Sequence, residues 1–322
     1  MKTFSLFTIL VLMTAPSFAA SASDAMKQAV EQLSSCGNFL RADQQFIYTG
    51  FGSYWTGSQS SRSPQPSVLR FIDFNTFKEN QVLANDSVID VLTHQNKTYV
   101  LTYSGIEEWD MAARQRVATY HTNSTDGRYA DEEHAQSFAV YQNKLVIAHG
   151  RLGVSIFDLN LKRVTLTIPL ISQGSLESVA RGVAVSGQHA FIVLDSYTLV
   201  SPTQKAPFRG IVVIDLKTET VIREIDGLPP GLDSVNADQK SLVLSFYGNP
   251  IWTYSIDSVL TAKNVKPTLR IFKFPLEGTP KGKALMDDKY YYTCFSQMPG
   301  PGEGSYYKKT KLVMNRSQFM PK

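Results

Sequence analysis

The sequence lacks the features that mark several classes of protein. After the first 20 residues, none of its apolar runs reaches the roughly 20 uncharged residues that a helix needs to cross a bilayer. Basic and acidic residues are nearly balanced, 32 against 28, and they alternate along the chain. A nucleic-acid-binding protein instead clusters its basic residues on one stripe. The densest basic group, Lys308, Lys309 and Lys311, lies beside a glycine-rich stretch and fits a solvated loop. We therefore expect no membrane span and no nucleic-acid partner.

Signals for catalysis and metal binding are also scarce. The five histidines are scattered, with no pair at the spacing of zinc ligands. No glycine-rich phosphate loop and no Gly-x-Ser-x-Gly elbow are present. The best metal candidate is the run from Asp131 to His134, but neighbouring residues of an extended strand point to opposite sides. We expect that run to be a solvated acidic loop and predict no cofactor, with a divalent metal as an open alternative.

The N-terminus has the three-part layout of a secretory signal peptide. Lys2 is followed by an apolar stretch from Phe4 to Met13 and then by small residues at Ala19, Ala20 and Ala22. The short segment with a single lysine is typical of bacteria, so we expect export to the periplasm or the medium. We assign residues 1–22 to the signal peptide, 23–37 to a partly helical leader and 38–322 to the main domain. Leu33 to Cys36 has the letters of a lipoprotein box, but charged residues separate it from the apolar stretch, which argues against lipidation.

A repeated mark organises the rest of the chain. Short apolar runs end in an acidic or amide residue at intervals of between 37 residues (Asp73 to Asp110) and 58 residues (Asp257 to Asn315). This spacing brackets the repeat length of a propeller blade. The marks are Asp73, Asp110, Asp158, Asp215, Asp257 and Asn315.

Four short strand-like runs with turn residues between them lie in each clear unit. In the clearest one, residues 180–185, 189–194, 210–215 and 221–225 are rich in β-branched and aromatic residues, as packed strands require. We predict an all-β single β-propeller, most simply with six four-stranded blades that start near residues 38, 87, 136, 180, 232 and 281. Seven blades fit less well, because the chain ends at Lys322 with little left for an outer strand.

The runs Gly182 to Gly187 and Gly210 to Asp215 resemble the repeat of the YVTN and LVIVD bacterial β-propellers. The resemblance covers nearly all of the mature chain and is strongest in the third and fourth units. It implies the propeller fold and transfers no catalytic residue. These families include binding, scaffolding and enzymatic members, so the activity stays open.

The two cysteines, Cys36 and Cys294, lie just before the first unit and inside the last one. A closed ring would bring them together, and an exported protein can keep a disulfide there. We therefore predict a Cys36–Cys294 disulfide, with two buried free thiols as the alternative.

Long connections gather, on this reading, at one face of the propeller. They are residues 51–66, 122–133, 197–208 and 297–309. Aromatic residues in such loops offer a large contact area with few bonds to freeze, although they also serve as covers over blade edges. The predicted partner-binding residues are Tyr54, Trp55, Tyr197, Phe208, Tyr306 and Tyr307.

Polar residues near the starts of the inner strands are expected to line the mouth of the central channel. A funnel of mixed charge suits a small anionic or sugar-like ligand, and a hydrated network of ion pairs is the alternative. The candidates are Asp86, His134, Gln136, Arg181, Asp233 and Lys283.

The sequence therefore favours an exported, non-catalytic propeller that binds a protein or a cell-envelope polymer through its long loops. The alternatives are a propeller enzyme acting on a sugar or lactone in the channel, which rests on analogy of fold alone, and a structural subunit of an envelope assembly.

Overall fold

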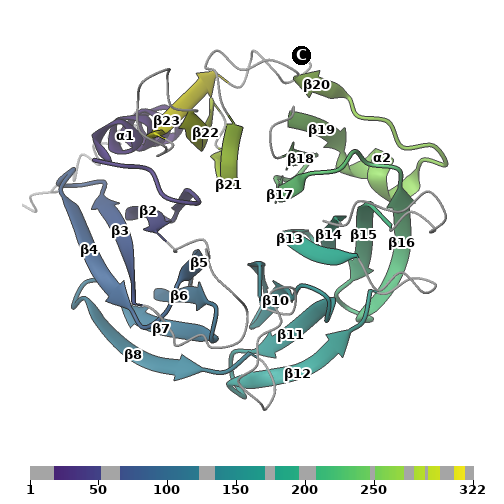
Figure 1. The fold of residues 1–322 in the computed structure, drawn as a ribbon, viewed down its shortest axis with the longest axis horizontal. Coiled ribbons are helices and arrows are strands. Elements are labelled where there is room, and N and C mark those ends of the chain that lie inside the picture. The colour runs from purple at the N-terminus through teal and green to yellow at the C-terminus, as the bar shows by residue number, and fades with distance from the viewer. Residues whose placement is uncertain are drawn as a thin grey trace, which may run out of the picture.

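The structure is a computed structural model, and it describes residues 18–51, 66–122, 135–170, 178–195, 208–246, 251–271, 279–286, 289–297 and 308–315. Its sheets stand around a common axis and form a closed ring, with the first strand of each sheet innermost (Figure 1). The first strands of neighbouring sheets contact one another all around the ring. The predicted all-β propeller is thus confirmed as an architecture.

Strand bounds follow the ring in chain order. Blade one has β1 (Arg41–Ala42), β2 (Phe46–Phe51), β3 (Ser67–Asp73) and β4 (Glu79–Ala84), and blade two has β5 (Val88–His94), β6 (Lys97–Thr102), β7 (Ile106–Asp110) and β8 (Gln115–Tyr120). Blade three has β9 (Ser137–Tyr141), β10 (Lys144–Ala148), β11 (Val154–Asp158) and β12 (Arg163–Ile168). Blade four has β13 (Val179–Ser186), β14 (His189–Asp195), β15 (Gly210–Asp215) and β16 (Thr220–Asp226). Blade five has β17 (Leu232–Ala237), β18 (Ser241–Phe246), β19 (Ile251–Ser255) and β20 (Leu269–Ile271).

The expected count of blades is wrong. Five sheets have the four antiparallel strands of a blade, not six or seven, and the last part of the chain forms a three-stranded sheet from β21 (Thr279–Met286), β22 (Tyr290–Gln297) and β23 (Lys308–Asn315). Among the described residues, no fourth strand pairs with β23. Helix α1 (Phe18–Gln32) lies beside this sheet and contacts both β22 and β23 (Figure 1). The element next to the last sheet is therefore a helix, which the strand pattern of the sequence does not reveal.

The repeated acidic mark is a turn device. Asp73, Asp110, Asp158 and Asp215 end the third strands of their blades, and each carboxylate accepts backbone N–H groups of the turn that follows. The fourth residue after each aspartate has a positive φ of 52° to 57°: these residues are Phe77, Arg114, Lys162 and Glu219. Hydrogen bonds from the turn amides lower the pKa of Asp158 and Asp215 below the ordinary value. Four of the six marks thus build the connection to the outer strand, whereas Asp257 lies in helix α2 (Ile256–Thr261) and Asn315 ends β23.

The core lies between adjacent blades, because both faces of each sheet are covered. In blade four, Phe191, Val193, Ile211 and Val213 pack toward blade five, whereas the residues that alternate with them, such as Ile192 and Val212, pack toward blade three. This alternation is the period of two that strands impose on their side chains. It explains why the strands of the blades read as nearly continuous apolar runs.

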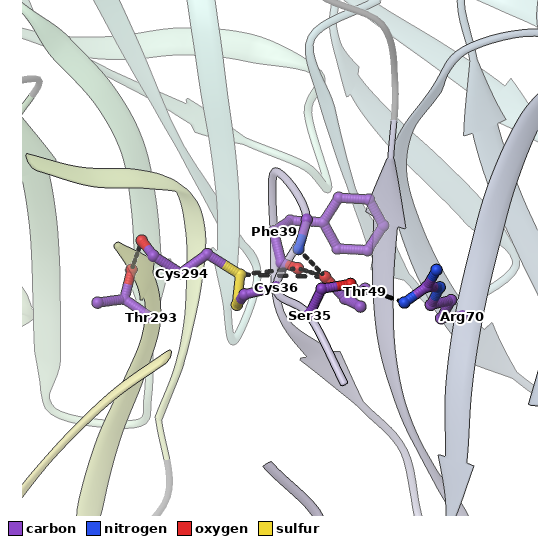
Figure 2. Close-up of a disulfide and its surroundings, with 8 residues drawn as sticks. Ser35, Cys36, Phe39, Thr49, Arg70, Thr293 and Cys294 are labelled. Carbon is purple, nitrogen blue, oxygen red and sulfur yellow. Dashed lines mark hydrogen bonds between the residues drawn. A yellow bond between two sulfur atoms is a disulfide. The ribbon is translucent and has the colours of Figure 1, made fainter. Parts of the chain in front are cut away.

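The two ends of the ring are joined by side chains. The predicted disulfide is confirmed: Cys36 and Cys294 are bonded across 258 residues of sequence, with their Cα atoms 5.4 Å apart (Figure 2). Both cysteines are fully buried, in a cluster that also holds Val30 and Leu33 near the end of α1. In the described part of the chain, no helix is long and apolar enough to span a membrane.

Candidate functional site

The ring has two unlike faces. Strands alternate in direction within each sheet, so the connections between second and third strands, and between one sheet and the next, leave from the same face. We call this the long-loop face, because its connections include residues 52–66, 121–136, 196–209 and 298–307. On the opposite, short-turn face, first and second strands are joined by tight turns such as residues 95–96, 142–143 and 187–188. The long-loop face is the candidate functional site.

Most of the aromatic residues predicted to bind a partner, Tyr54, Trp55, Tyr197, Tyr306 and Tyr307, lie outside the described residues. Phe208 is described: it is half-buried and packs against the apolar cluster between blades three and four. Its carbonyl oxygen accepts a hydrogen bond from the Ser178 hydroxyl at 3.0 Å. The Phe208 side chain therefore contributes to the core at the border of the long-loop face. Its role in binding stays a prediction.

A buried carboxylate braces the ends of the connection at residues 196–209. Asp195, which ends β14, is only 4% exposed. Its carboxylate accepts the Gly231 N–H at 2.9 Å and lies 3.5 Å from Nε of Arg209, just before β15. Because Gly231 directly precedes β17, Asp195 links blade four to blade five at this face. The connection therefore leaves and re-enters the ring at a fixed position.

The residues predicted for the channel mouth lie where inner strands begin, but they do not share one environment. Asp86, between β4 and β5, is buried, and its carboxylate accepts the Ser87 N–H at 2.7 Å. Gln136 directly precedes β9, and its N–H donates to the Ala148 carbonyl at 2.8 Å. Arg181 in β13 and Asp233 in β17 are half-buried at irregular points of their strands.

Two further channel candidates cannot be placed fully. His134 and the side chain of Lys283 lie outside the described residues, although the Lys283 backbone belongs to β21. Burial and, to a smaller extent, the Asp233 charge raise the pKa of Tyr291 in β22 of the neighbouring sheet. The combination of these six residues into one ligand site stays a prediction.

An ion pair between inner strands escaped the sequence analysis. Asp90 in β5 is fully buried, and its carboxylate accepts two hydrogen bonds from Arg41 in β1, at 2.8 and 3.1 Å. It also accepts the backbone N–H of Phe138 in β9, at 3.3 Å. One side chain therefore ties three consecutive inner strands together. The available signal was an acidic residue in an otherwise apolar strand, but its partners are 49 and 48 residues away in the sequence.

Two adjacent buried glutamates in β7 connect blade two to both of its neighbours. Glu107 accepts the N–H of Asn85, which follows blade one, at 2.9 Å. Glu108 lies on the other side, where its carboxylate contacts Nζ of Lys97 at 2.7 Å and Nζ of Lys162 in blade three at 3.2 Å. Burial would raise the pKa of Glu108, but hydrogen bonds from Lys97, Tyr120 and Lys162 lower it to about 2. These charges are internal ties and not a surface for substrate.

His149 and Ser155 form a pair that resembles part of a hydrolase site, because Nδ1 of His149 lies 2.8 Å from Oγ of Ser155. Both residues are 1% exposed, however, so no substrate reaches the hydroxyl in this conformation. Burial lowers the pKa of His149 to about 4, which keeps the imidazole neutral. Among the described residues, no three histidine, cysteine, aspartate or glutamate side chains are grouped for a metal ion. The run Asp131 to His134 lies outside them.

Comparison with known proteins supports the fold alone. No family model matches the chain, and no curated protein matches it. A chain in the crystal structure of the mitotic checkpoint complex is similar, with a TM-score of 0.54 and 11% sequence identity, over 84% of this chain and 72% of that chain. At that identity the likeness shows a shared β-propeller architecture and no more.

Proposed function

We propose that this protein is an exported, non-catalytic β-propeller that binds a partner protein through its long-loop face. The observation that carries the proposal is the asymmetry of the ring. Most turns of the short-turn face are tight or capped by an aspartate, and its longer connection at residues 256–268 holds helix α2 (Ile256–Thr261). The four long connections of the other face exceed what joining adjacent strands requires. Long loops on a rigid scaffold are where binding residues concentrate.

Export is supported by the disulfide together with the N-terminal layout. Disulfides persist in oxidising compartments and are rare in the cytosol. Cys36 and Cys294 are the only cysteines of the chain, and they form one buried disulfide. We propose the periplasm or the medium as the destination, after removal of residues 1–22. We also propose that the chain is a divergent relative of the YVTN and LVIVD repeat propellers.

A protein partner is favoured over a polymer because the similar propeller chain is part of a protein complex. The similar propeller chain was crystallised in a complex, the mitotic checkpoint complex, and that association belongs to that protein. For the present chain, the aromatic residues Trp55 and Tyr306 in the long connections are the proposed contacts.

The test compares capture of partners by three forms of the exported protein. Wild type, a Trp55→Ala/Tyr306→Ala variant and a Leu161→Ala variant are immobilised and exposed to envelope extract. Leu161 is a matched control because it is an apolar residue, 58% exposed, in a turn of the short-turn face. We expect the double variant to lose a stoichiometric protein partner that wild type and Leu161→Ala both retain. Equal capture by all three forms would remove the long-loop face from consideration.

A further inference from the structure

The closure of the ring differs from that of a propeller whose ends share a sheet. All four strands of blade one come from residues 41–84, and all three strands of the last sheet come from residues 279–315. In the described part of the chain, no sheet combines strands from the two ends. Backbone hydrogen bonds of a shared sheet therefore do not hold the seam between β1 and β21. Another device has to prevent the ring from opening there.

The leader, residues 23–37, supplies that device. On one side it is attached to blade one, because Arg70 in β3 donates hydrogen bonds to the hydroxyls of Ser34 and Ser35, both at 2.7 Å. Glu79 in β4 accepts the Ser34 N–H, also at 2.7 Å. Cys36 follows directly in the chain, so these bonds hold it at the edge of blade one (Figure 2).

On the other side, the leader reaches the three-stranded sheet. The Tyr292 hydroxyl donates to the carbonyl oxygen of Ser23 at 3.2 Å, and Nζ of Lys289 lies 3.3 Å from the Asp24 carboxylate. Nζ of Lys27 lies 5.5 Å from the centre of the Tyr290 ring. The hydrogen bond from Tyr292 is buried, as is the apolar cluster that Val30 and Leu33 share with Tyr292. The Lys289–Asp24 ion pair is partly exposed, and exposed ion pairs contribute little stability. The covalent bond from Cys36 to Cys294 in β22 is the strong link across the seam.

We propose that the leader is a redox-dependent clasp, which keeps the propeller closed only while the Cys36–Cys294 disulfide is intact. Reduction by a dithiol adds two electrons and two protons to the disulfide, gives two cysteine thiols and oxidises the reductant to its own disulfide. The leader would then separate from β22, and the apolar residues around the cysteines, including Leu33, Ile47 and Tyr292, would become accessible. The closed ring would be confined to oxidising compartments. This inference goes beyond partner binding and does not depend on which face binds.

Hydrogen exchange followed by mass spectrometry tests the clasp on the full exported chain. Oxidised wild type is compared with wild type reduced by tris(2-carboxyethyl)phosphine and with a Cys36→Ala/Cys294→Ala variant. We expect amide exchange in residues 23–51 and 289–297 to accelerate at least tenfold in both disulfide-free forms. Residues 137–168 and 210–226, far around the ring, should accelerate far less than the seam, because only the general loss of stability acts on them. Reoxidation of reduced wild type should restore the slow exchange at the seam.

A core variant separates local opening from general loss of stability. Val212→Ala removes methyl groups from the cluster between blades three and four, so its effect should not concentrate at the seam. If exchange in the disulfide-free forms accelerates by the same factor in every segment, or in none, the clasp is wrong. If the double alanine variant fails to fold, reduced wild type decides between these results. Loss of partner capture by Trp55→Ala/Tyr306→Ala has no bearing on this outcome, so the two proposals fail independently.

Discussion

Removal of the Asp90 carboxylate should destabilise the ring far more than an ordinary surface change. In Asp90→Ala, the Phe138 N–H loses its side-chain acceptor, and the Arg41 guanidinium loses two hydrogen bonds. An unsatisfied buried donor costs about 1 to 3 kcal/mol, and breaking a buried ion pair costs about 3 to 5 kcal/mol. The Arg41 side chain is 22% exposed and can turn partly to water, which reduces the second figure. We expect a loss of about 3 kcal/mol in the free energy of unfolding.

A double-mutant cycle in urea isolates the ion pair from the other contacts. Asp90→Asn keeps the size of the side chain and one carbonyl acceptor, so it should cost about half as much as Asp90→Ala. Arg41→Met removes the two guanidinium hydrogen bonds from the buried Asp90 carboxylate, which keeps its backbone donors. Each single change leaves the other member of the ion pair without its partner in the pair. The loss of free energy of unfolding in the double variant should therefore be about 1 to 2 kcal/mol smaller than the sum of the two single losses.

The reading of Asp90 as a tie between three strands would be refuted by either of two results. One is a loss below about 1 kcal/mol for Asp90→Ala at an unchanged urea slope, which is the size of an ordinary hydrogen bond. The other is additivity of Asp90→Asn and Arg41→Met within about 0.3 kcal/mol, as for independent sites.

Four further changes have defined outcomes. Cys36→Ala/Cys294→Ala removes a crosslink between residues 258 positions apart, which the loop-entropy model values at about 5 kcal/mol of the free energy of unfolding. The urea midpoint should fall accordingly. A decrease of less than about 1 kcal/mol in the free energy of unfolding would contradict that model here. Burial lowers the pKa of His149 from 6.5 to about 4, so the unfolded chain takes up the proton first and the free energy of unfolding should drop by about 3 kcal/mol as pH falls from 6.5 to 4. His149→Gln should remove this dependence in urea titrations at pH 7, 5 and 4, and His189→Gln should keep it. Hydrogen bonds that outweigh burial lower the pKa of Glu108 from 4.5 to about 2. The ionised carboxylate therefore stabilises the fold above pH 4.5, and this stabilisation is lost as the pH falls toward 2. The melting temperature of Glu108→Gln should be below that of wild type at pH 7, and the difference should vanish near pH 2. Asp215→Ala should lower the melting temperature more than Asp215→Asn, and two variants that melt like wild type would show that the aspartate turn contributes nothing.

Much of the ring could be predicted from local patterns because its units are local. Runs such as Ile192 and its neighbours, separated by Ser186-Gly187 and ended by Asp215, give the strands and turns of one blade without reference to any other. A helix was also expected within the leader, residues 23–37. The helix ends at Gln32, because Ser34 and Ser35 are held by Glu79 and Arg70 of blade one. That end point comes from tertiary contacts, which local spacing does not contain.

The parts that escaped prediction depend on contacts between distant residues. Six four-stranded blades were expected because every clear unit has four strands, but a strand pattern does not tell how the last unit is completed. Arg41 and Asp90 are unremarkable in sequence, since a charged residue on a strand usually faces water. Only the ring brings β1, β5 and β9 close enough for one carboxylate to bond to all of them. The disulfide was predictable because two cysteines allow a single pairing.

The division of the ring into two faces explains why its fold is easier to predict than its function. The four capping aspartates, and the non-glycine residues of positive φ that follow them from Phe77 to Glu219, lie on the short-turn face, where each repeat must connect its third strand to its fourth. A change there alters the blade itself. The connections of the long-loop face only need to span the distance between strand ends that Asp195 and the inner strands already fix. On the proposed function, the residues that select a partner therefore lie in the segments that the repeat constrains least.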